Sequence, residues 1–158
     1  MRIRFAIRHL LVGWLLCGVP TITGAAPPPI VIDDFDGALD WAPFPADGVT
    51  LDLSQDTGLH GKALRMDFGF TGGGYAVARK KVSLDLPENY AFTFQLMAQA
   101  PVNHLEIKFL DESGENVWWY VRRDLTFPRA WQSLSTKKRQ ITFAWGPAPG
   151  ELKHVAAI

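Results

Sequence analysis

Apolar and polar residues alternate with a period of two through most of this chain, and this alternation constrains the fold more than any other feature. In the segment 63–70, Leu64 and Met66 fall on one side while Arg65 and Asp67 fall on the other. Successive side chains of an extended strand point to opposite faces, so the segment is typical of a half-buried β-strand. No run of about a dozen residues keeps the period of a helix. The sequence therefore predicts an all-β chain.

Further segments with strand character follow at regular intervals, separated by stretches rich in Gly, Pro, Asn and Asp. They lie at 49–53, 75–84, 90–98, 104–111, 116–123, 131–138 and 139–145. About nine short strands spaced about ten residues apart are typical of an antiparallel sandwich or barrel. We expect an antiparallel jelly-roll β-sandwich. The glycine-rich segment 70–75 lacks the context of a nucleotide-binding loop and is expected to be a hairpin connection.

The segment 152–158 has the character of an apolar strand that is just beginning. A sandwich that lacked its last strand would leave an open sheet edge, which proteins normally cover. We therefore expect the sandwich to be missing its last strand and the chain to be the N-terminal piece of a longer protein.

The first 26 residues have the pattern of a secretory signal peptide: basic residues, an apolar run of ten, and small residues at the end. Residues 27–29 then read as a proline-rich linker, and residues 30–158 as one β-sandwich domain. Because Cys17 is the only cysteine and lies in the leader, the mature chain has no disulfide. An exported chain without cysteines is more typical of a secreted or periplasmic bacterial protein than of a small eukaryotic extracellular module, which usually needs disulfides.

The charge balance excludes two classes of partner. Removal of the leader, with its three arginines, leaves 13 basic and 16 acidic residues, a net charge of −3 with histidine neutral. Such a chain has no long-range attraction for nucleic acid or for an anionic membrane surface. We expect neither partner for the mature protein.

The stretch ENVWWYVRRDLTFPRAW, residues 115–131, concentrates aromatic and basic side chains. If it is a strand, alternation divides it into two faces. The set assigned to the core is Val117, Trp119 and Val121. The set assigned to the outer face is Trp118, Tyr120 and Arg122. A shift by one residue at a bulge would exchange Trp118 and Trp119.

The outer set predicts a ligand-binding face. Alternation also turns Gln95, Glu106 and Lys108 outward, and they share this face if their strands are adjacent. Flat rings beside hydrogen-bonding groups suit a carbohydrate, because the C–H face of a sugar packs on an aromatic ring while polar groups satisfy its hydroxyls. The alternative is that a following domain or another protein covers the same face.

The acidic segment IDDFDGALDW contains Asp33, Asp34 and Asp36, with Asp40 close behind. Clustered carboxylates in a secreted β-sandwich favour a structural calcium ion, whose preferred ligands are oxygens. The alternative is that these aspartates accept hydrogen bonds from backbone amides at turns. Both interpretations stay open at this point.

Catalytic motifs are weak in this sequence. His60, His104 and His154 have neither the spacing of metal ligands nor a partnered nucleophile. We therefore expect a binding module rather than an enzyme. A jelly-roll lyase or hydrolase remains a second alternative, because the separation of two catalytic carboxylates is spatial and not sequential.

The runs VIDDFDG, TGLHGKALRMDF, NVWWYVRRD and FAWGP carry a resemblance to a known family. The chain resembles the galactose-binding-like jelly-roll carbohydrate-binding modules at the N-terminus of secreted bacterial proteins that degrade polysaccharides. That resemblance implies a polysaccharide or oligosaccharide ligand and following glycoside hydrolase or discoidin-like domains of the same chain as partners. It also implies, for Asp33 and Asp34, a match to the opening acidic motif that lies near a structural calcium in some relatives.

Overall fold

The alternating segments form antiparallel strands in the computed structural model, which describes residues 11–12 and 28–158. The strands are β1 (Leu11–Val12), β2 (Ile30–Val31), β3 (Ala42–Pro45), β4 (Val49–Thr57), β5 (Lys62–Phe70), β6 (Ala76–Arg79), β7 (Lys81–Asp85), β8 (Ala91–Leu96), β9 (Asn103–Leu110), β10 (Val117–Leu125), β11 (Gln132–Lys137), β12 (Thr142–Trp145) and β13 (His154–Ala157). One short 3₁₀ helix, η1, spans Lys138–Gln140. Apart from residues 11–12, the predicted leader of residues 1–26 lies outside the described residues.

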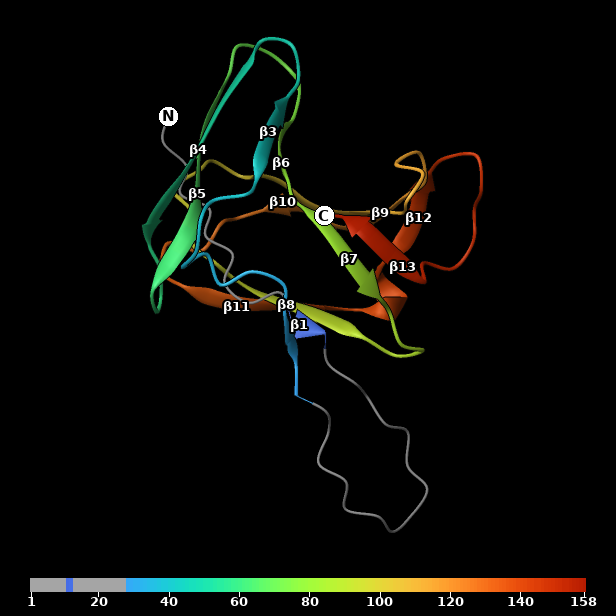
Figure 1. The fold of residues 1–158 in the computed structure, drawn as a ribbon. Coiled ribbons are helices and arrows are strands. Elements are labelled where there is room, and N and C mark those ends of the chain that lie inside the picture. Colours follow the sequence, from blue (N-terminus) through green and yellow to red (C-terminus); the bar gives the residue numbers. More distant parts are fainter. Residues whose placement is uncertain (1–10, 13–27) are drawn as a thin grey trace.

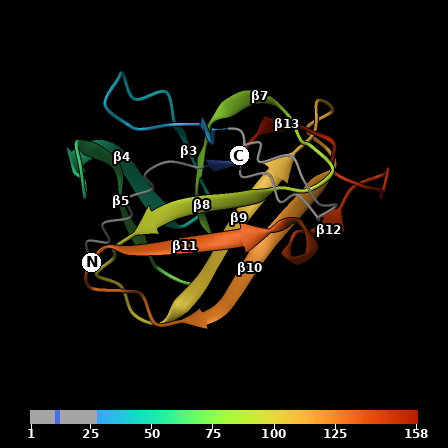
Figure 2. The same cartoon turned by 90° about the horizontal axis from the view of Figure 1, so that it is seen from below.

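The largest sheet has five strands in the order β12-β10-β9-β13-β7, and β8 pairs with β11 in a second layer. Figures 1 and 2 show these two layers facing each other, with the β4–β5 hairpin at one end. The β3–β6 pair rises beside that hairpin (Figure 1). This all-β antiparallel arrangement is consistent with the expected β-sandwich. The jelly-roll type remains a prediction.

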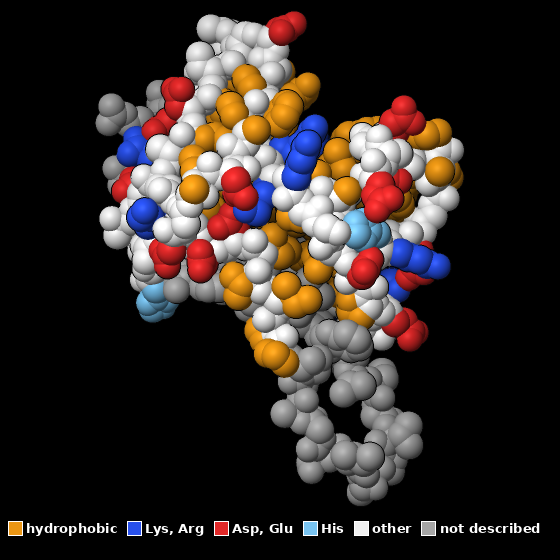
Figure 3. All heavy atoms as spheres, in the orientation of Figure 1, with side chains coloured by type: hydrophobic (Ala, Val, Ile, Leu, Met, Phe, Trp, Pro, Cys, Tyr) orange, Lys and Arg blue, Asp and Glu red, His pale blue; other side chains and the backbone are white. Residues whose placement is uncertain are grey.

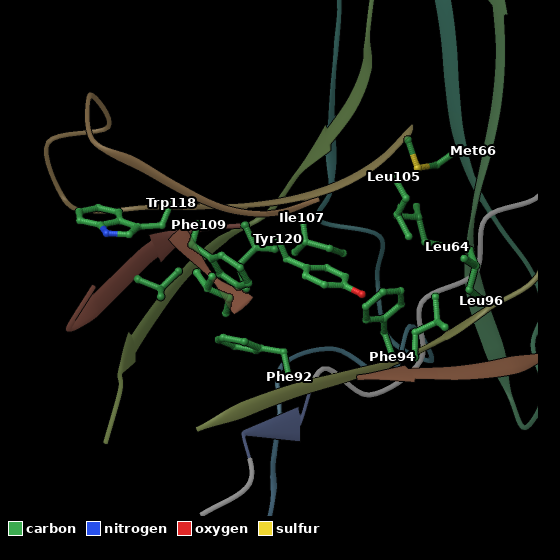
Figure 4. Close-up of a cluster of buried hydrophobic side chains, with 14 of the residues drawn as sticks. Leu64, Met66, Phe92, Phe94, Leu96, Leu105, Ile107, Phe109, Trp118 and Tyr120 are labelled. Atoms are coloured by element: carbon green, nitrogen blue, oxygen red, sulfur yellow. The ribbon is translucent and has the colours of Figure 1, made fainter. Parts of the chain in front are cut away.

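The core lies between the two layers and is rich in aromatic side chains (Figure 4). Phe92 of β8 and Phe109 of β9 are fully buried, and their rings stack with centroids 4.6 Å apart. Figure 4 shows Phe92 below Phe109 and Phe94 beside the hydroxyl end of Tyr120, so both phenylalanines of β8 point toward the opposite sheet. The alternation predicted for β8 and β9 is confirmed, because Phe92, Phe94, Ile107 and Phe109 all point inward.

Strand β13 occupies a place between β9 and β7 rather than at a sheet edge. Ala157 pairs with Leu110 on one side and with Lys81 on the other. Within the apolar segment 152–158, residues 154–157 therefore form a strand that pairs with β7 and, at Ala157, also with β9. The expectation that the sandwich lacks its last strand stays a prediction.

Two local features differ from the sequence expectation. The predicted strand 75–84 is divided at Lys80 into β6, which pairs with β3, and β7, which pairs with β13. The strand β3 has the sequence APFP, whose prolines hide its strand character, because proline lacks a backbone donor and is tolerated mainly at edges. Nowhere in residues 11–12 and 28–158 is there a helix with the length and apolar character needed to span a bilayer.

The stacked pair of phenylalanines should dominate stability. Phe92→Ala is expected to lower the free energy of unfolding by about 3–5 kcal/mol, because it removes a buried ring and leaves a cavity. Chemical denaturation would measure the change. Gln95→Ala on the opposite face of the same strand is the control and should change the value by less than about 0.5 kcal/mol. Equal losses in the two variants would contradict the assigned faces of β8.

Candidate functional site

The structure reverses the predicted faces of β10. Trp118 and Tyr120 are buried in the core, with 6% and 9% of their surfaces exposed. In the antiparallel pair with β9 they lie opposite Phe109 and Ile107, and directly opposed residues share a face. The indole Nε1–H of Trp118 donates to the carbonyl of Gly150 at 2.9 Å, so its polar atom is satisfied inside the protein. The prediction that these two rings face outward is wrong.

The other predicted contacts do not gather around one site. Arg122 continues the inward-facing side of β10 and is exposed near the end of that strand, where it pairs with Leu105. Gln95 lies on β8 and pairs with Ser133 of β11, in the layer on the far side of the core. The assumption that β8 and β9 are neighbours in one sheet is therefore wrong. Lys108 and Glu106 do lie on the aromatic outer face.

A different aromatic group, here called the aromatic platform, lies on the outer side of the five-stranded sheet. It consists of Trp119 of β10, Trp145 of β12 and Tyr75, which precedes β6 and approaches the sheet at Lys108. Tyr75 and Trp145 are 57% and 46% exposed. Trp119 is half-buried, pairs with Lys108 across the strands, and meets Trp145 edge to face with ring centroids 5.6 Å apart. Alternation with the apolar residues Val117 and Val121 predicted a core position for Trp119, and that prediction is wrong.

Two charged side chains lie among these rings. The Lys108 Nζ is 5.1 Å from the ring centroid of Trp145 and 5.6 Å from that of Tyr75. It also lies 3.2 Å from Oε2 of Glu106. The lysine is thereby held between two aromatic faces and one carboxylate, which leaves hydrogen-bonding groups of both kinds beside exposed rings.

A groove of about 270 Å³ borders the platform. It runs between β6 and β9, and its lining includes Tyr75, Arg79, Glu106, Lys108 and Ile158. Its floor is made of apolar core side chains such as Leu64, Met66, Leu105, Ile107 and Phe127. Figure 3 shows a notch between the part that carries β3 and the part that carries β12, with basic side chains beside it. The volume is near the lower end of the range for small-ligand pockets.

The turn before β10 holds the loop that follows Trp145. Buried Asn116 accepts a hydrogen bond from the amide of Ala148 at 2.8 Å and donates from Nδ2 to Asp111 at 2.7 Å. Gly146 has a φ of +132°, and an added Cβ would lie 2.5 Å from Oδ1 of Asn116. A side chain at position 146 would therefore displace the loop and, with it, Trp145.

The carboxylate of Asp111 organises this turn. It accepts hydrogen bonds from the amide of Ser113 at 3.1 Å and from its hydroxyl at 2.5 Å, in addition to Asn116. Burial would raise the pKa of Asp111, but the hydrogen bonds from Ser113, Asn116 and the Gly114 amide together outweigh that effect and lower it. The negative carboxylate is thus the form that stabilises the turn.

The predicted calcium ligands lie in a turn whose carboxylates already have protein donors. Asp33 accepts from the amide of Phe35 at 2.7 Å and from the indole of Trp41 at 2.8 Å. Asp34 accepts from the amide of Asp36 at 3.0 Å, and Asp36 accepts from the amide of Lys62 at 2.7 Å. Within the described part of the chain, no three His, Cys, Asp or Glu side chains converge as a metal-binding group.

A lysine supplies the positive charge in this segment. The Lys80 Nζ lies 3.0 Å from Oδ2 of Asp33 and contacts the carboxylate of Asp40 as well. Burial alone would lower the pKa of Lys80, but the hydrogen bonds to Asp40 and Asp33 outweigh it and the pKa is raised. An ammonium in this position repels a second cation, so the donor set fits a lysine-bridged turn better than a calcium site. The calcium ion stays a prediction.

Comparisons with models of protein families, with curated proteins and with solved structures found no match. The candidate site therefore stands on its own geometry.

A substitution at Lys80 tests the contribution of its ion pairs with Asp33 and Asp40 to stability. Lys80→Met is expected to lower the free energy of unfolding by about 1–3 kcal/mol, since two carboxylates lose a charged donor. Because the pKa of Lys80 is raised in the folded state, its contribution is fully present below its ordinary value of 10.5 and is lost only as the pH rises through the raised value. The deficit should thus persist from pH 7 to pH 9 in denaturation experiments. Lys81→Met, at the exposed next position, is the control, and an equal loss there would argue against the bridge.

The turn at Asp111 should make stability depend on pH. The stabilisation from a lowered carboxyl pKa is present above the ordinary value of 3.8 and disappears as the pH falls through the lowered value. Asp111→Asn should therefore unfold more easily than the wild type at pH 7, and the difference should shrink below about pH 4. Thermal denaturation at pH 7 and at pH 3 would measure the difference in melting temperature between the variant and the wild type. Glu115→Gln, at an exposed position, is the control. An equal difference in melting temperature at both pH values would contradict the stabilisation of the turn by the Asp111 carboxylate.

Proposed function

We propose that the protein binds a polysaccharide or oligosaccharide through the aromatic platform, without a catalytic step. The observation that carries the proposal is the exposure of Tyr75 and Trp145 beside Lys108 and Glu106 on one sheet face. Large aromatic side chains exposed as a group are uncommon unless they contact a partner. The geometry supports the kind of face that the sequence predicted, with Trp119 in the place assigned to Trp118.

The arrangement suits the chemistry of sugars. A pyranose presents apolar C–H groups on one side, which pack on rings, and hydroxyls around its edge, which both donate and accept hydrogen bonds. Lys108 supplies donors and Glu106 supplies acceptors within reach of the same rings. The edge-to-face contact of Trp119 with Trp145 restricts both rings, so less side-chain entropy is lost on binding.

The ligand of such a face is expected to bind weakly. An open sheet face with a few ring contacts covers only one side of a sugar, whereas strong small-molecule sites enclose most of the ligand. Linkage to other modules raises the effective affinity of such sites. The proposed setting is therefore a secreted or periplasmic bacterial protein in which this domain accompanies carbohydrate-active domains of the same chain.

A panel of polysaccharides tested by affinity electrophoresis would examine this function. We expect retardation by one class of glycan, and Trp119→Ala should reduce the affinity at least tenfold because it removes a central ring contact. Gln95→Ala, in the opposite layer, is the matched control and should migrate like the wild type. Circular dichroism would verify that each variant is folded.

Two outcomes would overturn the proposal. Free migration of the folded wild type through every glycan would contradict carbohydrate binding. Retardation that survives Trp119→Ala together with Trp145→Ala would show that sugar binds elsewhere on the protein.

A further inference from the structure

The charges that β9 places beside the aromatic platform form one pair of opposite sign. Glu106 and Lys108 lie two residues apart on this strand, so both side chains point to the outer face of the sheet. Oε2 of Glu106 lies 3.2 Å from Nζ of Lys108, and the two side chains are only 32% and 24% exposed. Their partners across the strand pair, Val121 and Trp119 of β10, carry no charge. The two charges therefore compensate each other next to the rings.

Three groups hold the ammonium of Lys108 in place. Nζ lies over the ring of Trp145, 5.1 Å from its centroid, and over the ring of Tyr75, 5.6 Å from its centroid, in addition to its contact with Glu106. A cation over an aromatic ring is attracted by the negative face of the ring. Movement of the lysine toward a ligand would weaken all three contacts. Lys108 is therefore expected to donate hydrogen bonds from its present position.

An acidic sugar would meet opposing effects at this pair. Its carboxylate or sulfate would be attracted by Lys108 and repelled by Glu106, whose oxygen is next to the same ammonium. Removal of that charge from water would also cost far more free energy than removal of a hydroxyl. A hydroxyl, in contrast, can accept a hydrogen bond from the ammonium and donate one to the carboxylate. The pair thus favours uncharged sugars.

We propose that Glu106 determines the ligand class of the aromatic platform and restricts it to uncharged glycans. This inference rests on the proposed carbohydrate binding and adds to it the exclusion of polysaccharides that carry carboxylates or sulfates. Glu106 acts by compensating the charge of Lys108. Without Glu106, the same lysine beside the same rings would attract an acidic sugar. Selectivity of this kind depends on a repulsive group as well as on attractive contacts.

The effect of this pair can be separated from that of the overall charge. Glu106→Gln and Glu88→Gln remove one negative charge each, and Glu88 is an exposed residue in the connection between β7 and β8. Charges on the surface that are more than about 10 Å apart are largely screened at ordinary salt concentrations. Only the substitution at position 106 takes the carboxylate away from Lys108, so only that variant should change the selectivity.

The experiment compares charged and uncharged forms of one glycan backbone. A neutral polysaccharide that retards the protein is oxidised at its primary hydroxyls to a polyuronate, and part of the product is converted to the methyl ester. Acid and ester then differ mainly in charge. An acidic polysaccharide that retards the protein is compared with its own methyl ester. Calorimetric titration of the wild type, Glu106→Gln and Glu88→Gln with both forms measures the affinities.

We expect the wild type and Glu88→Gln to bind the acid about five- to tenfold more weakly than the ester. In Glu106→Gln the difference should fall below about twofold, because Lys108 is then free to pair with the ligand. High salt should reduce the discrimination in the wild type and leave the affinity for the ester unchanged, since only charged groups are screened.

Different outcomes would overturn different claims. Equal or tighter binding of the acid by the wild type would overturn the restriction to uncharged glycans and leave carbohydrate binding intact. An ester that binds as weakly as the acid would show that shape and not charge decides, and would also overturn the restriction. Discrimination that persists in Glu106→Gln would overturn the role of Glu106. Absence of binding to every glycan, charged or uncharged, would instead overturn the proposed function itself.

Discussion

The pairing register of β9 with β10 determines which rings of this protein are core and which are surface. Phe109 lies opposite Trp118 and Ile107 opposite Tyr120, so buried residues of one strand meet buried residues of the other at these positions. The stacked contact of Phe109 with Phe92 joins that face to the second layer. A slip of β10 by one residue against β9 would bury Trp119 and expose Trp118 and Tyr120, which is costly because every side chain of β10 would change faces. The platform and the groove both follow from this register.

The sequence predicted the all-β fold and the inward faces of β8 and β9, because period-two alternation reports burial directly. It failed at β10 because almost every position from Val117 to Val121 is apolar or aromatic, so alternation offers no contrast. The information was present in the hairpin itself. If DESGE closes the turn and Leu110 lies opposite Val117, Trp118 must share a face with Phe109. Register, not residue type, identifies the outward tryptophan.

The rest of the candidate site depends on contacts that no local pattern reports. Tyr75 and Trp145 come from segments far from Lys108 in the sequence, and only the fold brings the three together. For the aspartates near residue 33, the sequence left both calcium binding and turn hydrogen bonding open, because it does not show which distant residues contact them. Their partner Lys80 is more than forty residues away, and its ammonium satisfies the charge for which the sequence suggested a metal ion.

The central place of β13 has a consequence for how the chain folds. His154 and Asp85, which lie side by side in the sheet, are separated by 69 residues in the sequence. Contacts between such distant residues form late, because the entropy of closing a long loop must be overcome first. Until residues 154–157 are inserted, β7 and β9 lack their shared neighbour and the sheet cannot reach its final width. Nascent chains that end before this segment are therefore expected to remain in a partly assembled, protease-sensitive state.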